Sequence, residues 1–193
     1  MPPTREPDAI VVGAGTAGSY AAATIARAGY DVTVLERKPE DEAGHIACGD
    51  ALKGADEFPD SIPKATFEHA ISNPDVDHGR FEIPAADTIL DIPVPGELAV
   101  IDRLAFGKAI IEGAQDAGAQ FQFDTVVTDV LQEGTQVTGV EAIQDGETRT
   151  FEAPIVVDAA GALSLLQDKA DLDATTFDTK VTYKQFTSAY REI

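Results

Sequence analysis

Tryptophan is absent from this sequence of 193 residues, and cysteine and methionine occur once each. The single cysteine, Cys48, has no partner for a disulfide within the chain, which is typical of a protein from a reducing compartment. The opening stretch MPPTREPD has no basic segment followed by an apolar one, as a secretory signal would have. We therefore expect a cytoplasmic protein.

Long apolar runs are also missing. Runs such as Ile10 to Ala14 and Ile155 to Val157 are far shorter than the roughly 20 residues that a helix needs to span a bilayer. The sequence therefore predicts no transmembrane helix.

Positive charge is scarce, because 14 Lys and Arg stand against 34 Asp and Glu and the net charge is −20. No basic cluster occurs, so a nucleic-acid site would lack its main source of affinity, and this class of partner is excluded. The acidic residues are spread along the chain, which favours a surface adapted to strong salt over an acidic binding tail. We expect a protein from a halophilic archaeon.

Salt should stabilise this protein if its acidic surface is an adaptation to strong salt. We expect the Tm to rise between dilute buffer and molar KCl, because the ions screen repulsion among the carboxylates. Thermal melts followed by circular dichroism measure the effect, and an unchanged Tm would contradict the explanation.

The remaining composition indicates a globular fold. Apolar residues make up 44% of the chain, and the length corresponds to roughly one domain. The first 35 residues predict a strand over 9–12, a helix over 16–28 that ends at Gly29, and a strand over 31–35. A strand, a Gly-rich turn, a helix and a strand within about 30 residues form a βαβ unit.

The rest of the chain mixes loops, strands and one further helix. Residues 37–50 read as loop, and residues 66–95 contain prolines that leave only short edge strands. A strand over 97–101 leads to a helix that Asp102 caps and Gly118 ends. Segments 120–123, 126–131, 137–143 and 148–151 predict an antiparallel meander with a hairpin turn at Asp145-Gly146, and 155–157 a buried strand.

The motif Gly13-x-Gly15-x-x-Gly18 matches the dinucleotide-binding fingerprint, in the strand-to-helix context that the fingerprint requires. Its glycines permit a tight turn, a close approach of the pyrophosphate and close packing of the helix on the strand. Glu36 ends the second strand, where a carboxylate binds the ribose hydroxyls and repels a 2′-phosphate. A Gly-rich turn can be purely structural, but the combined context favours cofactor binding.

Four segments, the first of which contains the fingerprint, carry a resemblance to a known family. They are VVGAGTAGSYAA with VLERK, CGDAL at 48–52, IDRLAFGKAIIEGAQDAGA at 101–119 and VVDAAGALS at 156–164. The sequence resembles the FAD-dependent geranylgeranyl reductases, within the larger group that includes p-hydroxybenzoate hydroxylase. The motifs follow the family's order and span almost the whole chain.

The resemblance implies a set of cofactor contacts. Arg103 matches the arginine near the FAD phosphate and ribitol, with a solvated helix-start arginine as the alternative. Cys48-Gly49 resembles the segment beside the isoalloxazine, which makes Cys48 a catalytic candidate; a small buried residue is the alternative. The pattern that closes over the cofactor includes Ala159, Gly161 and Ser164, although Ala160 replaces its aspartate. The other predicted contacts are Thr16, Ala17, Arg37 and Val127.

The resemblance also implies a fold and domain boundaries. We expect an α/β, Rossmann-like FAD-binding domain with a parallel sheet, an antiparallel meander insertion and the start of a second sheet. Residues 1–65 and 96–175 would form the FAD-binding domain, and 66–95 and 176–193 partial strands of a truncated substrate domain. The chain would be the N-terminal part of a longer enzyme.

The implied activity is reduction of the isoprenoid double bonds of archaeal ether lipids by FAD, with NAD(P)H or another reductant as the electron donor. The lipid substrate would allow peripheral membrane contact. An aromatic monooxygenase of the same group, a non-catalytic nucleotide-binding module and an NAD-dependent dehydrogenase are the alternatives. No metal is expected, because His69, Asp75, Asp77 and His78 lack a convincing ligand spacing.

Overall fold

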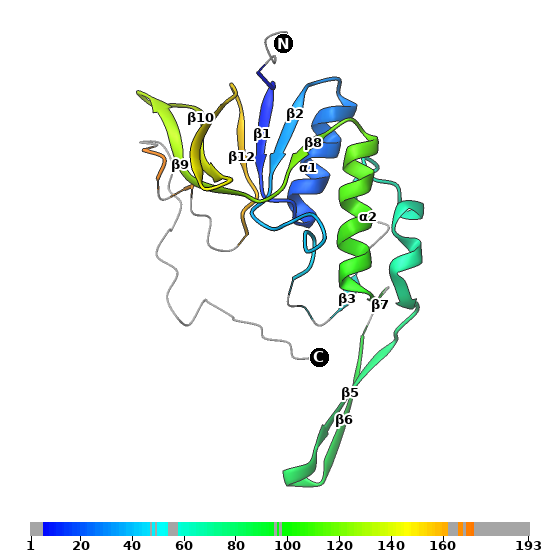
Figure 1. Ribbon diagram of the computed structural model, residues 1–193. Coiled ribbons are helices and arrows are strands. Elements are labelled where there is room, and N and C mark those ends of the chain that lie inside the picture. Colours follow the sequence, from blue (N-terminus) through cyan, green and yellow to red (C-terminus); the bar gives the residue numbers. More distant parts are fainter. Residues whose placement is uncertain are drawn as a thin grey trace.

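A computed structural model describes residues 6–46, 48, 50–53, 58–94, 96, 98–161, 166–167 and 169–171. In these residues a parallel sheet has two helices on one face and an antiparallel meander on the other, and a hairpin projects from the body (Figure 1). This mixed α/β architecture confirms the predicted fold class. The predicted strands of 176–193 lie outside the described residues.

The parallel sheet has the strand order β12-β1-β2-β8. Its strands are β1 (Ala9–Val12), β2 (Val32–Leu35), β8 (Gln120–Gln122) and β12 (Val156–Asp158), and all three pairings are parallel. Every residue of β1 and β2 is buried, as expected for strands covered on both faces.

The prediction that residues 120–123 begin the meander was wrong. These residues form β8, which pairs in parallel with β2. The helix that precedes β8 supplies the long crossover that a parallel pairing requires. The chain then turns at Asp124, whose φ is 51°, and enters the meander.

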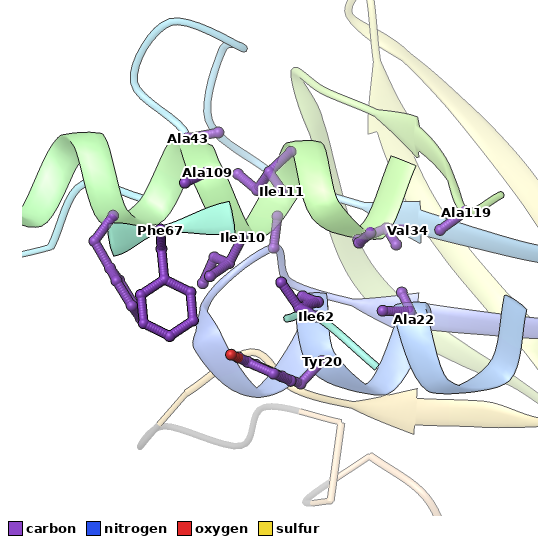
Figure 2. Packing of buried hydrophobic residues seen from close by; sticks show 14 of the residues in the cluster. Tyr20, Ala22, Val34, Ala43, Ile62, Phe67, Ala109, Ile110, Ile111 and Ala119 are labelled. Carbon is purple, nitrogen blue, oxygen red and sulfur yellow. The ribbon is translucent and has the colours of Figure 1, made fainter. Parts of the chain in front are cut away.

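Alternate residues of the central strands face different layers. Ala9 and Val11 of β1 belong to the core beneath the helices, whereas Ile10 and Val12 belong to the core beneath the meander. This alternation follows from the two-residue period of a strand. The helix-side core joins α1 (Thr16–Arg27) and α2 (Arg103–Asp116), and Figure 2 shows members of this core from both helices, among them Tyr20 and Ala22 of α1 and Ile110 of α2.

The ends of both helices agree with the sequence prediction. Gly29 follows α1 with a φ of 89°, and Gly118 follows α2 with a φ of 109°. The carboxylate of Asp102 accepts a hydrogen bond from the Ala105 N–H at 3.0 Å and so caps α2. Within the described chain, neither helix is both long and apolar enough to cross a membrane.

A small antiparallel sheet lies beside the start of α2. It has the order β3-β7-β4, with β3 (Ala51–Lys53), β7 (Leu98–Ile101) and β4 (Ile71–Asn73). Two 3₁₀ turns, Lys64–Thr66 and Glu68–Ala70, precede β4 and bury Phe67 against Phe106 of α2. The Ile101 N–H donates to the Asp50 carbonyl at 2.8 Å, which places Asp50 near the beginning of α2.

The meander consists of β9 (Thr125–Glu133), β10 (Gln136–Gln144) and β11 (Glu147–Glu152) in antiparallel order. The predicted hairpin turn is confirmed, because Asp145 and Gly146 both have positive φ between β10 and β11. The inner face of the meander packs against the parallel sheet. Val140 of β10 and Ala153, which follows β11, are buried in the core between them.

The projecting hairpin is formed by β5 (His78–Ile83) and β6 (Thr88–Pro93). Phe81 pairs with Leu90, and Gly79 with Ile92, so the side chains of Phe81, Leu90 and Ile92 lie on one face. All three are exposed, as is the neighbouring Ile83. The short edge strands expected in 66–95 are therefore present, and they carry an uncovered apolar face.

Candidate cofactor site

Three loops meet at the carboxyl edge of the parallel sheet. The Gly13 N–H donates to the Leu35 carbonyl at 2.8 Å, and the Ala159 N–H donates to the Val12 carbonyl at 2.9 Å. The loops that follow β1, β2 and β12 are thus held side by side. In open α/β sheets this edge is where ligands bind.

The three glycines of the fingerprint differ in what restricts them. Gly13 has a φ of 100°, and a Cβ there would lie 2.6 Å from the Ala159 carbonyl oxygen. A Cβ on Gly18 would lie 1.9 Å from the Gly13 carbonyl oxygen. A Cβ on Gly15 would meet no atom of the described residues within 4 Å. The fold itself therefore requires Gly13 and Gly18, whereas the space at Gly15 is left open for a ligand.

The amino-terminal end of α1 borders this open space. Gly15 is the N-cap residue, and no side chain of the described chain caps the helix there. Thr16 is half-buried and Ala17 is exposed in the same turn. The amide groups and the positive end of the helix dipole make such a terminus a binding site for a phosphate group.

Glu36 is buried at the end of β2, with 8% of its surface exposed. Its Oε2 accepts a hydrogen bond from the Ala14 N–H at 2.7 Å, and its Oε1 accepts one from the Lys38 N–H at 2.9 Å. The carboxylate therefore fixes the Gly-rich turn, and each oxygen retains a further lone pair for a hydroxyl donor. The neighbouring Arg37 is exposed.

Arg103 begins α2 and is only 7% exposed, so the alternative of a solvated arginine is wrong. Its Nη2 donates to Thr16 Oγ1 at 3.0 Å, and its guanidinium lies 5.0 Å from the centre of the Phe106 ring. The Nε atom is buried and has no hydrogen-bond partner among the residues that the structure describes. Burial lowers the pKa of Arg103, while the acidic groups of Cys48 and Asp50 oppose this shift.

Cys48 is a free, half-buried cysteine that interacts electrostatically with Arg103. This interaction brings the predicted catalytic residue to the region of the Gly-rich turn. Its position beside a flavin stays a prediction, and Gly49 lies outside the described residues.

The turn after β12 depends on a residue that the sequence did not single out. Asp158 Oδ1 accepts a hydrogen bond from the Ala160 N–H at 3.0 Å. An aspartate that accepts a hydrogen bond from the backbone two residues later forms an Asx turn. An aspartate at the end of a predicted strand was therefore the sequence signal for this turn. Ala159 and Gly161 border the same turn, and Ser164 lies outside the described residues.

Val127 lies on β9 and packs, partly buried, against the core that contains Val12 and Leu35. The nearby Thr125 N–H donates to the Glu36 carbonyl at 2.9 Å, which brings the start of β9 to the end of β2. The predicted contact between Val127 and a cofactor is compatible with this place but stays a prediction. The described residues contain no group of three or more His, Cys, Asp or Glu side chains able to hold a metal ion.

Comparison with known proteins identifies the family of this fold. The family model described as "FAD binding domain" matches residues 6–189. The chain is 31% identical over 179 residues to digeranylgeranylglycerophospholipid reductase of Haloferax volcanii, covering 86% of this chain and 38% of the relative. It is 36% identical over 174 residues to a probable electron transfer flavoprotein-quinone oxidoreductase, YdiS of Escherichia coli, covering 82% and 37%.

Solved structures of flavoproteins are also similar to this chain. The geranylgeranyl bacteriochlorophyll reductase-like protein of Thermoplasma acidophilum superimposes with a TM-score of 0.70 at 25% identity, covering 88% of this chain and 43% of that one. The flavin-dependent brominase Bmp2 has a TM-score of 0.67 at 21% identity and shares the fold. The chain spans about two fifths of the length of the relatives it matches.

Proposed function

The chain belongs to the FAD-binding domain family, whose cofactor is FAD, and from that premise we propose that it is the cofactor-binding part of a reductase acting on isoprenoid lipids. The observation that carries the proposal is the meeting of the Gly-rich turn, Glu36 and Arg103 at one edge of the parallel sheet. The similarity to a digeranylgeranylglycerophospholipid reductase supports the substrate class.

The residues at this edge fit FAD. Open space at Gly15 would admit the pyrophosphate to the amides of α1. The buried Arg103 offers a positive charge and an Nε that none of the described residues binds. The Glu36 carboxylate would accept hydrogen bonds from the adenosine ribose and would repel a 2′-phosphate. These features support a site for the ADP half of FAD at the loops after β1 and β2.

FAD bound at this site would, in its reduced form, provide the hydride for reduction of a carbon–carbon double bond, and the second carbon of that bond would receive a proton. The chain's own residues would contribute by binding and orientation: Arg103 and the start of α1 would hold the phosphates, and the turn at 158–161 would border the cofactor. Cys48 would lie on the flavin side of this site, as the family motif implies.

The hairpin of β5 and β6 would belong to the substrate domain. Its face of Phe81, Leu90 and Ile92 is exposed in this chain, and an isolated two-stranded hairpin is marginal in water. A larger sheet, as the greater length of the relatives allows, would cover this face. Residues 66–95 are therefore proposed as a contribution to that domain.

The absorbance spectrum of the purified protein tests the cofactor site directly. We expect flavin bands near about 370 and 450 nm to remain after FAD is added and excess is removed by desalting. A colourless protein that FAD cannot reconstitute would contradict the proposed site. Anaerobic reoxidation of the reduced flavoprotein by a geranylgeranyl lipid then tests the substrate; reoxidation only when an aromatic substrate and oxygen are supplied would favour a monooxygenase.

A further inference from the structure

Arg103 is a buried cation whose charge the described residues balance only in part. Its guanidinium group has five N–H donors, and the hydrogen bond to Thr16 Oγ1 is a contact with a neutral oxygen. Within the described part of the chain its Nε has no hydrogen-bond partner, and the aromatic ring beneath it, Phe106, is fully buried. A buried charge is costly unless it is paired and fully hydrogen-bonded.

Thr16 connects Arg103 to the start of α1, the other element that would bind the phosphates. Thr16 is the first residue of α1 and Arg103 the first residue of α2, so their hydrogen bond joins two helix starts that are far apart in sequence. Both helix starts carry the positive end of a dipole, which raises the cost of a cation placed between them.

We propose that Thr16 is a positioning residue, whose hydroxyl holds the Arg103 guanidinium beside the amides of α1 so that one pyrophosphate meets both. In the protein without cofactor the positive charge of Arg103 is balanced only in part, by Asp50 and Cys48, and the binding of an anionic dinucleotide adds stability. FAD affinity and fold stability are coupled through Arg103. This inference rests on the proposed cofactor site.

Substitution of Thr16 tests the positioning role by affinity. In Thr16→Val the hydroxyl is lost while the shape is kept, and we expect the Kd for FAD, measured by quenching of flavin fluorescence, to rise about tenfold. Thr16→Ser should restore the Kd to within about twofold of the wild type, because its hydroxyl still accepts the bond.

Thr24 offers a matched control on the same helix. Its hydroxyl lies 2.9 Å from Ser61 Oγ and 2.7 Å from the Tyr20 carbonyl oxygen, away from Arg103. Thr24→Val should leave the Kd for FAD unchanged. A Thr16→Val variant that binds FAD like the wild type would overturn the positioning role, as would a Thr24→Val variant that loses as much affinity.

Substitution of Arg103 tests the coupling to stability. We expect the cofactor-free Arg103→Met variant to melt at or above the wild-type Tm, because the unbalanced buried charge is gone. Addition of FAD should raise the wild-type Tm but not that of the variant. A lower Tm of the cofactor-free variant, or an undiminished rise with FAD, would overturn the coupling.

The outcomes distinguish a failure of the cofactor site from a failure of the role of Thr16. A wild-type protein that shows neither retained flavin nor a rise in Tm with FAD would refute the cofactor site itself. A wild-type protein that binds FAD, with a Thr16→Val variant equal to it, refutes only the role of Thr16.

Discussion

The Gly18→Ala variant is expected to be strongly destabilised. The new Cβ would lie 1.9 Å from the Gly13 carbonyl oxygen, and the Gly13 N–H is tied to the Leu35 carbonyl, so this backbone cannot simply withdraw. Alanine in place of glycine inside a helix normally gains about 1 kcal/mol, and here the clash reverses the sign. We expect a loss of about 3 kcal/mol, measured by urea denaturation.

Gly15→Ala is the matched control in the same turn. A Cβ at this position meets no atom within 4 Å, and the φ of −70° suits alanine. The variant should therefore keep its stability yet lose FAD, because the methyl group occupies the space left for the pyrophosphate. A Gly18→Ala variant as stable as the wild type, or a Gly15→Ala variant with undiminished FAD binding, would contradict this division of roles.

Phe106→Ala is expected to destabilise the fold by about 3–5 kcal/mol. The ring is fully buried, packs edge-on against Phe67 with centroids 5.1 Å apart, and lies beneath the Arg103 guanidinium. Its removal leaves a cavity in the core and takes away the ring that supports Arg103, so the affinity for FAD should fall as well. Urea denaturation gives the first effect, and a fluorescence titration gives the second.

Phe81→Ala is the control for this loss. Phe81 is 56% exposed on the projecting hairpin, and truncation of an exposed side chain changes stability by no more than about 0.5 kcal/mol. Its affinity for FAD should match that of the wild type. Equal losses in the Phe81 and Phe106 variants would show that the buried aromatic cluster has no special part in stability.

Local patterns in the sequence were sufficient to predict most of the fold. The buried run at 9–12, the glycines after both helices and the cap at Asp102 each act over a few residues, and the structure confirms them. The place of β8 was not predictable in this way. A short strand carries no mark of its partner, and its pairing with β2 is decided by the crossover through α2.

The candidate site likewise has a part that local sequence patterns predict and a part that they do not. The spacing of the glycines and the acidic end of β2 predict a dinucleotide site because the fingerprint is local. The hydrogen bond from Arg103 to Thr16 and the placement of the guanidinium over Phe106 could not be predicted from spacing. The first of these contacts depends on how α1 and α2 dock, which is a property of the assembled core.

The strand order has a consequence for the kinetics of folding. β1 lies at the centre of the parallel sheet and pairs with β12, so Ile10 must find Val156. Contacts of such large sequence separation require closure of a long loop and slow the search for the native state. During synthesis one edge of β1 stays unpaired until β12 has left the ribosome, and until then the Gly-rich turn lacks the neighbouring backbone that holds it.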